Sequence, residues 1–243
     1  MRLSIIIPAF NEEKTIADVL HSLIREIPDV YEIIVVDDGS KDRTTQIAET
    51  VCQQYAQIRL IRHPHNQGKT AALRTGFAAS TGDIVLVQDA DLEYDPVDIP
   101  ELVEPIQKGK ADVVYGSRFM IRRASRVLYF KHYLANQFLT FLSTLFTDLN
   151  LSDVETGYKA FRGEIIRNMI IETRGFGFEI EVTAKVAKLK CRVYEVPISY
   201  NGRTYEEGKK IGFRDGLDAI LYTFKYNLFV RLEKSYTKVP VLS

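Results

Sequence analysis

Two aspartates one residue apart, Asp89 and Asp91, end the largely apolar run at 83–88. Continuous aliphatic and β-branched runs are typical of strands that are covered on both faces of a parallel sheet. The two carboxylates should therefore emerge at the carboxyl edge of the sheet, where open α/β folds bind ligands. Paired carboxylates there suit a hard divalent cation, Mg²⁺ or Mn²⁺, that is shared with a substrate diphosphate. The alternative interpretation is a helix cap at Asp91 and a solvated Asp89.

Carboxylates also follow two earlier apolar runs, because Glu12 comes after the run at 3–7 and Asp38 after the run at 32–36. Each of these runs is succeeded by apolar residues at helical spacing. Repeated strand–helix–strand units imply right-handed crossovers and a parallel sheet. The sequence therefore predicts an α/β fold that gathers four acidic residues along one edge, namely Glu12, Asp38, Asp89 and Asp91.

Five short motifs follow one another along the chain, and they are Pro8-Ala9-Phe10-Asn11-Glu12, Val36-Asp37-Asp38-Gly39-Ser40, Asn66-Gln67-Gly68-Lys69, Asp89-Ala90-Asp91-Leu92 and Gly116-Ser117-Arg118. In type and order they resemble the motifs of family 2 glycosyltransferases. Later motifs narrow the resemblance to dolichol- and polyprenyl-phosphate hexose synthases, and they are Thr156-Gly157-Tyr158-Lys159, Phe178-Glu179-Ile180-Glu181 and the stretch at 202–210. The resemblance implies a single GT-A domain at 1–215, with a Rossmann-like, mostly parallel central sheet flanked by helices. An amphipathic C-terminal helix and tail would follow at 216–243.

The same resemblance implies an inverting transferase whose donor is a GDP- or UDP-linked sugar. Asp89 and Asp91 would hold the divalent cation, and Asp38 would approach the nucleotide base or ribose. The other donor-pocket residues that it implies are Pro8, Phe10, Glu12, Val36 and Ala90. Phe10 stands where tyrosine is more frequent in the family, so the ring is kept and the hydroxyl is lost.

Basic residues supply candidate phosphate ligands. The planar guanidinium groups of Arg118 and Arg203 suit bidentate contacts to phosphate, so both are candidate catalytic residues together with Asp91. Lys209 would add a positive charge to the donor diphosphate when its glycine-flanked, charged loop closes, or it is ordinary surface charge. Arg118 has an alternative role in an ion pair with an acidic residue, Asp112 or Glu93. The candidates for the acceptor phosphate are Arg118, Lys131 and Arg203.

The acceptor decides whether the enzyme needs a general base. A lipid phosphate is already anionic near neutral pH, since its second pKa is about 6, whereas a sugar hydroxyl must lose a proton to a carboxylate. The chain has no tryptophan, so it lacks the tryptophan-containing acceptor motif of relatives that glycosylate hydroxyl groups. We therefore expect transfer to a polyprenyl or dolichyl phosphate. Transfer to a saccharide hydroxyl is the alternative, with Asp153, Glu179 or Glu181 as the base.

Two further classes fit less well. A nucleotidyltransferase would share the sheet and the metal site, but the glycine-rich phosphate loop is missing after the first strand. A nucleotide-sugar sensor needs no leaving-group chemistry, which leaves the paired aspartates and the basic residues at 203 and 209 without a purpose.

Composition indicates one globular enzyme domain, because 243 residues with 46% hydrophobic and 26% charged residues contain no Pro/Gly/Ser-rich linker. The formal net charge is zero, so no nucleic-acid partner is expected. Cys52 and Cys191 lie far apart without a metal-ligand spacing, which favours buried free thiols. Met1 leads almost directly into a strand, so we expect no signal peptide and a cytoplasmic location.

The segment at 122–147 combines a basic start with an aromatic- and leucine-rich helix. Its apolar runs are far shorter than the roughly 20 residues that span a bilayer. The segment is therefore either an interfacial helix or a core helix packed on the sheet. The stretch at 213–232 repeats the pattern, with charges inside it. We expect no transmembrane span, a peripheral contact with the inner face of the membrane, and an integral membrane partner for the product.

Overall fold

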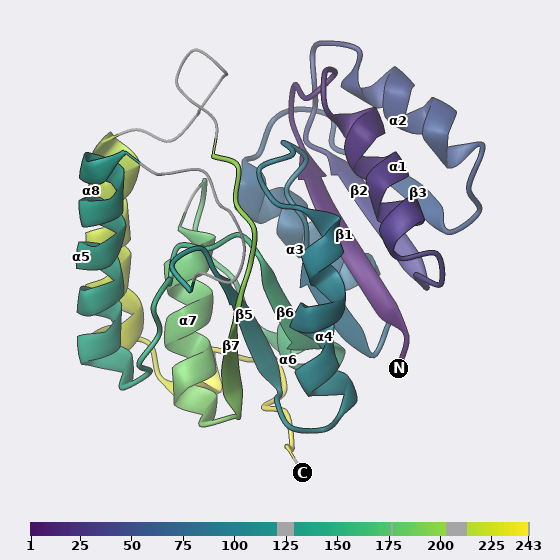
Figure 1. The fold of residues 1–243 in the computed structure, drawn as a ribbon. Helices are drawn as coiled ribbons and strands as arrows, with labels where there is room; N and C mark the ends of the chain where they lie inside the picture. The colour runs from purple at the N-terminus through teal and green to yellow at the C-terminus, as the bar shows by residue number, and fades with distance from the viewer. Residues whose placement is uncertain (121–128, 176, 203–212, 243) are drawn as a thin grey trace.

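The computed structural model describes residues 1–120, 129–175, 177–202 and 213–242. Within these ranges seven strands form one sheet in the order β3-β2-β1-β4-β6-β5-β7 (Figure 1). They are β1 (Leu3–Ala9), β2 (Glu32–Asp37), β3 (Ile58–Arg62), β4 (Ile84–Val87), β5 (Val113–Ser117), β6 (Lys159–Arg162) and β7 (Val193–Pro197). Neighbouring strands are parallel except where β6 runs antiparallel to β4 and β5. The predicted mostly parallel sheet is confirmed.

Helices cover both faces of the sheet (Figure 1). One face carries α1 (Ile16–Glu26), α2 (Thr44–Cys52) and α4 (Ile99–Gln107), and the other carries α3 (Lys69–Ala79), α6 (Gly163–Asn168) and α7 (Phe178–Leu189). Side chains alternate between the two faces along a strand, so Ile5 and Ile7 join the first layer and Ile6 joins the second. Coverage on both faces explains why these strands are apolar throughout.

A further layer of helices lies outside α7. In it, α5 (Phe130–Thr147) and α8 (Phe213–Phe224) pack against each other and against α7. The α8 helix continues into a π-helical turn, η2 (Lys225–Phe229), and short 3-10 helices occur at η1 (Pro96–Asp98) and η3 (Leu232–Lys234). Among the described residues, no helix is both long and apolar enough to cross a membrane. The division of the chain at residue 215 stays a prediction, and α8 runs across that point.

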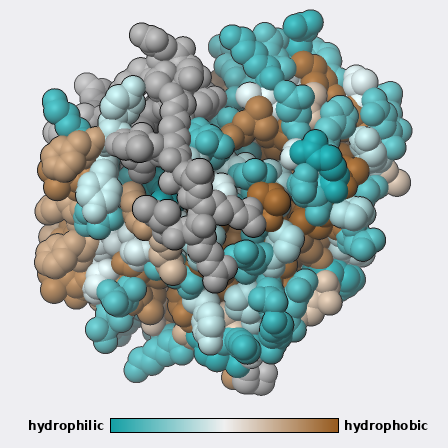
Figure 2. Space-filling view, viewed as in Figure 1, coloured by the Kyte–Doolittle hydropathy of each residue, from teal (hydrophilic) through white to brown (hydrophobic). Residues whose placement is uncertain are grey.

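The outward surface of α5 is apolar. Its buried residues form a narrow stripe, Leu139, Thr140 and Ser143. On the opposite side, five large apolar side chains are at least 53% exposed, namely Phe130, Leu134, Phe138, Phe141 and Leu145. The neighbouring α8 and η2 add a second exposed stripe, Leu217, Leu221, Phe224 and Leu228. Apolar side chains gather at the edge of the molecule where α5 lies (Figure 2). Thus α5 is a surface helix that packs on other helices.

Candidate functional site

A cavity of about 710 Å³ lies between the carboxyl ends of β1, β2 and β4 and the helices α5 and α8. The structure brings most of the predicted site residues to its wall, and they are Pro8, Phe10, Glu12, Asp38, Asp89, Ala90, Asp91 and Arg118. On the opposite side the wall is largely apolar and includes Phe138, Leu139, Leu217 and Ile220. A polar edge of the sheet and an apolar helical layer therefore share one cavity.

Some predicted residues lie elsewhere. Val36 is fully buried between the sheet and α3, where it packs with Ile6 and Ile34, and it does not line the cavity. Lys131 is an exposed residue in the first turn of α5 and is also absent from the cavity wall. Arg203 and Lys209, predicted to contact phosphate, lie outside the described residues.

Asp38 supports the start of α3. Its side chain is almost fully buried and accepts hydrogen bonds from the backbone N–H groups of Gln67, at 3.1 Å, and Gly68, at 2.7 Å. Nδ1 of His63 lies 2.7 Å from the same carboxylate. Gly68 has φ +93°, a conformation that favours glycine. Asp38 thus fixes the turn that places Lys69 at the first position of α3.

Lys69 joins two carboxylates of the cavity wall. Its Nζ atom lies 2.9 Å from Oδ1 of Asp89 and 3.3 Å from Oε1 of Glu179. Burial alone would lower the pKa of Lys69, but the charges of Asp89 and Glu179 raise that pKa well above its ordinary value. An ammonium group therefore stands beside the first aspartate of the predicted metal pair.

The donor set at Asp89 and Asp91 fits a divalent cation. Both carboxylates line the cavity. The ammonium group of Lys69 lies against Asp89, where it would compete with the cation for that carboxylate. Mg²⁺ is usually held by one or two carboxylates together with substrate phosphates. No group of three or more His, Cys, Asp or Glu with the geometry of a metal site occurs within the described ranges. The alternative cap at Asp91 is not found, because Asp95 caps the next helical turn.

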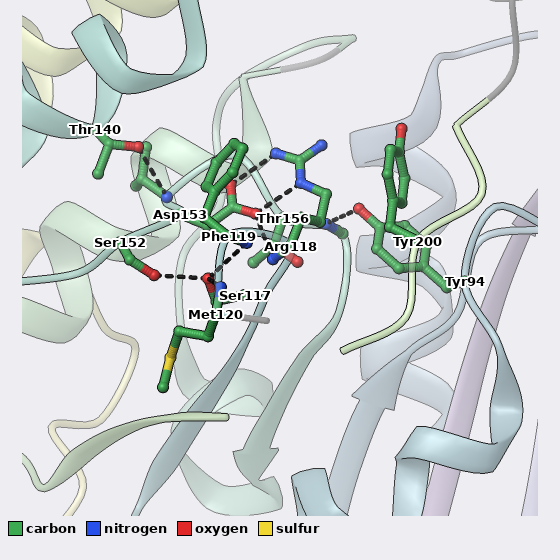
Figure 3. Close-up of polar contacts among 12 residues, drawn as sticks. Tyr94, Ser117, Arg118, Phe119, Met120, Thr140, Ser152, Asp153, Thr156 and Tyr200 are labelled. Carbon is green, nitrogen blue, oxygen red and sulfur yellow. Dashed lines mark hydrogen bonds and ion pairs between the residues drawn. The ribbon is translucent and has the colours of Figure 1, made fainter. Parts of the chain in front are cut away.

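Arg118 is held in a buried ion pair. Its Nε atom donates to Oδ2 of Asp153 at 2.6 Å and one terminal nitrogen donates to Oδ1 at 2.7 Å (Figure 3). The Asp153 side chain is fully buried, and the guanidinium carbon of Arg118 lies 5.1 Å from the ring centre of Tyr200. Asp153, rather than the predicted alternatives Asp112 and Glu93, is thus the acidic partner of Arg118.

Carboxylates that the sequence offered as possible bases occupy different places. Glu179 lines the cavity. Asp153 is engaged by Arg118, and Glu181 is fully buried away from the cavity, where it pairs with Lys185 at 2.5 Å. Glu155 is a cavity residue that the sequence interpretation missed. Its position just before the Thr156-Gly157 motif was the available signal.

The carboxyl group of Glu155 has a raised pKa. Burial and the neighbouring charge of Glu179 raise the pKa of the Glu155 carboxyl to about 8. Lys159 is fully buried nearby, and burial lowers the pKa of its ammonium group to about 8. Perturbed groups of this kind cluster at functional sites, so Glu155 belongs among the candidate site residues.

A solved glycosyltransferase has a similar fold. Glucosyl-3-phosphoglycerate synthase from Mycobacterium tuberculosis, in complex with Mn²⁺, uridine diphosphate and phosphoglyceric acid, superimposes with a TM-score of 0.73 at 23% sequence identity. The match covers 93% of this chain and 78% of that one. At this identity the likeness shows the fold, which is the predicted GT-A fold.

Curated relatives match most of the chain. Dolichol-phosphate mannosyltransferase of Pyrococcus furiosus is 30% identical over 217 residues, 87% of this chain and 60% of its own length. Undecaprenyl-phosphate mannosyltransferase of Micrococcus luteus is 29% identical over 243 residues, 96% of this chain and 97% of its own length. This chain therefore spans less than two thirds of the first relative and nearly all of the second. The sequence profile for glycosyl transferase family 2 matches residues 4–170, and the chain belongs to that family.

Proposed function

We propose that this glycosyltransferase moves a hexose from a nucleotide diphosphate sugar to a polyprenyl or dolichyl phosphate at the cytoplasmic face of a membrane, with inversion at C1. The observation that carries the proposal is the two-sided cavity, in which carboxylates at the sheet edge face an apolar wall from α5 and α8. Phe138 and Leu217 line that wall and are also 53% and 48% exposed, so the cavity opens onto the apolar surface. A lipid phosphate could enter there with its chain along the helices.

The reaction would be a single displacement. An oxygen of the lipid phosphate attacks C1 of the sugar, the bond from C1 to the nucleoside diphosphate breaks, and the diphosphate leaves with the bonding electron pair. A divalent cation at Asp89 and Asp91 would compensate the charge of that leaving group, as the Mn²⁺ complex of the M. tuberculosis enzyme suggests. The phosphate nucleophile has no proton to lose, so the protein's task is to position it.

The residues have proposed roles on that basis. Pro8, Phe10, Glu12, Ala90 and Asp38 would form the nucleotide side of the cavity, with Asp38 acting through the turn that it holds. Arg118, fixed by Asp153, would present its positive charge to phosphate. Val36 would act only as core support. Lys131, Arg203 and Lys209 keep their proposed phosphate contacts as predictions from sequence.

Membrane contact would use the apolar surface of α5, α8 and η2. Contiguous exposed apolar surface on this scale commonly marks a protein or membrane interaction site. The sequence of α5 contains no acidic residue, so it would not be repelled by an anionic leaflet. An integral membrane protein that receives the glycosylated lipid is the partner we would expect there.

A saccharide hydroxyl is the second candidate acceptor, and Glu155 is the observation that favours it. A carboxyl group with a pKa of about 8 lines the cavity, and a general base works best when its pKa is near the operating pH. If Glu155 were the base, Glu155→Gln should abolish transfer but leave donor binding intact. The family assignment argues against a nucleotidyltransferase.

The test is transfer from radiolabelled GDP-mannose and UDP-glucose, with Mg²⁺ or Mn²⁺, into a short polyprenyl phosphate that is recovered in organic solvent. We expect label in the lipid phase with one donor, and its loss in Asp91→Ala and Arg203→Ala. Glu172→Ala, on an exposed side chain outside the cavity, is the matched control. Donor hydrolysis without lipid labelling would contradict the proposal.

A further inference from the structure

Two acidic side chains on the wall of the cavity each have a buried oxygen without a partner. Oε1 of Glu155 and Oε2 of Glu179 have no hydrogen-bond partner among the described residues, and neither does the buried hydroxyl of Thr156. Glu179 is only 4% exposed. Buried polar atoms in proteins are nearly always hydrogen-bonded, because leaving one unpaired is costly. These oxygens therefore indicate a ligand that brings hydrogen-bond donors.

The unpaired oxygens lie beside the predicted metal pair. Lys69 is within 3.3 Å of both Asp89 and Glu179, so those two carboxylates are separated by one ammonium group. On the other side, a Cβ added to Gly157 would lie 2.5 Å from Oδ2 of Asp89. The segment that carries Glu155 thus packs directly on Asp89. A group linked to a diphosphate at Asp89 would therefore lie close to the unpaired oxygens of Glu155 and Glu179.

The chemistry of that group follows from the oxygens. Phosphate oxygens are acceptors and would be repelled by the ionised carboxylate of Glu179, and an apolar chain would leave the buried oxygens unpaired. Hydroxyl groups both donate and accept hydrogen bonds. Since the pKa of Glu155 is raised to about 8, its carboxyl is mostly protonated at neutral pH and can also do both. A sugar ring, which carries several hydroxyl groups, could therefore form hydrogen bonds with the unpaired oxygens of Glu155 and Glu179.

We propose that Glu155 and Glu179 form the subsite that binds hydroxyl groups of the donor hexose. The inference rests on the proposed function, because it takes the sugar diphosphate to lie at Asp89 and Asp91. In this role the two residues recognise the sugar and not the nucleotide. They therefore determine which donor is accepted, since a donor without the matching hydroxyl leaves a buried oxygen unpaired.

The test compares equilibrium binding of nucleotide and nucleotide sugar, with Mn²⁺ and without acceptor. Calorimetry would give the dissociation constants of GDP, GDP-mannose, UDP and UDP-glucose for the wild type and for Glu155→Ala. We expect affinity for the bound sugar nucleotide to fall roughly tenfold to a hundredfold, while affinity for the free nucleotide stays the same. Glu155→Gln, whose amide also donates and accepts, should recover most of the loss. Glu172→Ala, on the protein surface, should change none of the four dissociation constants.

A second measurement needs no variant and stays valid if Glu155→Ala fails to fold. Binding of monodeoxy forms of the preferred donor to the wild type should drop at least tenfold for one hydroxyl position. Equal binding of all deoxy donors, or an unchanged ratio of nucleotide to sugar-nucleotide affinity in Glu155→Ala, would overturn this subsite alone. Failure of the wild type to bind any of the four nucleotides would instead overturn the proposed function and the subsite with it. If Glu155 were only a general base, Glu155→Ala would lower transfer but leave the ratio of nucleotide to sugar-nucleotide affinity unchanged for both GDP and UDP. That outcome would also contradict the subsite.

Discussion

The ammonium group of Lys69 lies 2.9 Å from the carboxylate of Asp89. Asp89 belongs to the pair that would hold a divalent cation, so the lysine and the cation would share that carboxylate. The second contact of Lys69, to Glu179 at 3.3 Å, gives the ammonium group an alternative acidic partner. Cation binding and the position of Lys69 should therefore be coupled.

Lys69→Met tests this coupling. Removing a like charge from the site should tighten Mn²⁺ binding to the nucleotide-free protein by about fivefold or more, because two unit charges about 4 Å apart in water repel each other by roughly 1 kcal/mol. Free Mn²⁺ can be followed by electron paramagnetic resonance during a titration. Lys108→Met is the control, since Lys108 pairs with the exposed Glu104 at the end of α4, away from the cavity. Equal Mn²⁺ affinities for both variants would contradict the coupling.

Asp153→Asn tests the buried ion pair with Arg118. Because both side chains are at most 9% exposed, an uncompensated guanidinium group would remain buried, and we expect the free energy of unfolding to fall by about 3 to 5 kcal/mol. Urea denaturation measures this. The exposed pair of Glu104 and Lys108 is the comparison, and Glu104→Gln should have far less effect on the free energy of unfolding, because solvent screens an exposed pair. A similar loss of unfolding free energy in the two variants would show that the buried Arg118 pair contributes no more to stability than an exposed pair.

The apolar surface of α5 should bind lipid. Phe141 and Leu145 are 65% and 66% exposed and lie outside the cavity wall. Since burying each of these side chains is worth about 1.5 to 3 kcal/mol, replacing both by serine should weaken binding to phospholipid vesicles by at least roughly a hundredfold. Sedimentation with vesicles gives the partition coefficient. Tyr194→Ser, at a residue 44% exposed on β7, should leave it unchanged, and equal partitioning of the two variants would count against this surface.

Glu155 should make stability depend on pH. Its pKa is raised from 4.5 to about 8 in the folded chain, so the folded state binds the extra proton between these values. The contribution of Glu155 to the free energy of unfolding is therefore fully present below about pH 4.5, and it is lost as the pH rises through about 8. Glu155→Gln does not titrate, so its stability relative to the wild type should rise between pH 5 and pH 8. Parallel pH profiles in thermal unfolding would mean that the pKa of Glu155 is ordinary.

Sequence periodicity was enough to predict the sheet edge. Apolar strands that end at Glu12, Asp38 and Asp91 could only converge once a parallel sheet was assumed, and all three line the cavity. The motif that contains Asp38 did not predict correctly that Val36 would line the cavity. Val36 lies two residues before Asp38, inside β2, where α3 covers it. A motif identifies a segment, whereas the register of the strand decides which side chain reaches the ligand.

Pairings across long stretches of sequence could not be predicted. Arg118 meets Asp153 from 35 positions away, and Lys69 meets Glu179 from 110. The first contact depends on where β6, inserted antiparallel between β4 and β5, places the segment that precedes it, and the second depends on the packing of α7 beside α3. The placement of that segment leaves Glu155 half-buried at the cavity wall, although the sequence marks it as an ordinary polar residue.

Competition between a lipid phosphate and the corresponding lipid alcohol shows which of the two the enzyme uses as its acceptor. Equal concentrations of a short polyprenyl phosphate and of the matching polyprenol would be incubated with enzyme, Mn²⁺ and the preferred nucleotide sugar, and the products resolved by mass spectrometry. We expect glycosylated polyprenyl phosphate with an inverted anomeric centre and no glycosylated polyprenol, because only the phosphate can attack without a base. Glycosylated polyprenol as the main product would show that the acceptor is not the lipid phosphate.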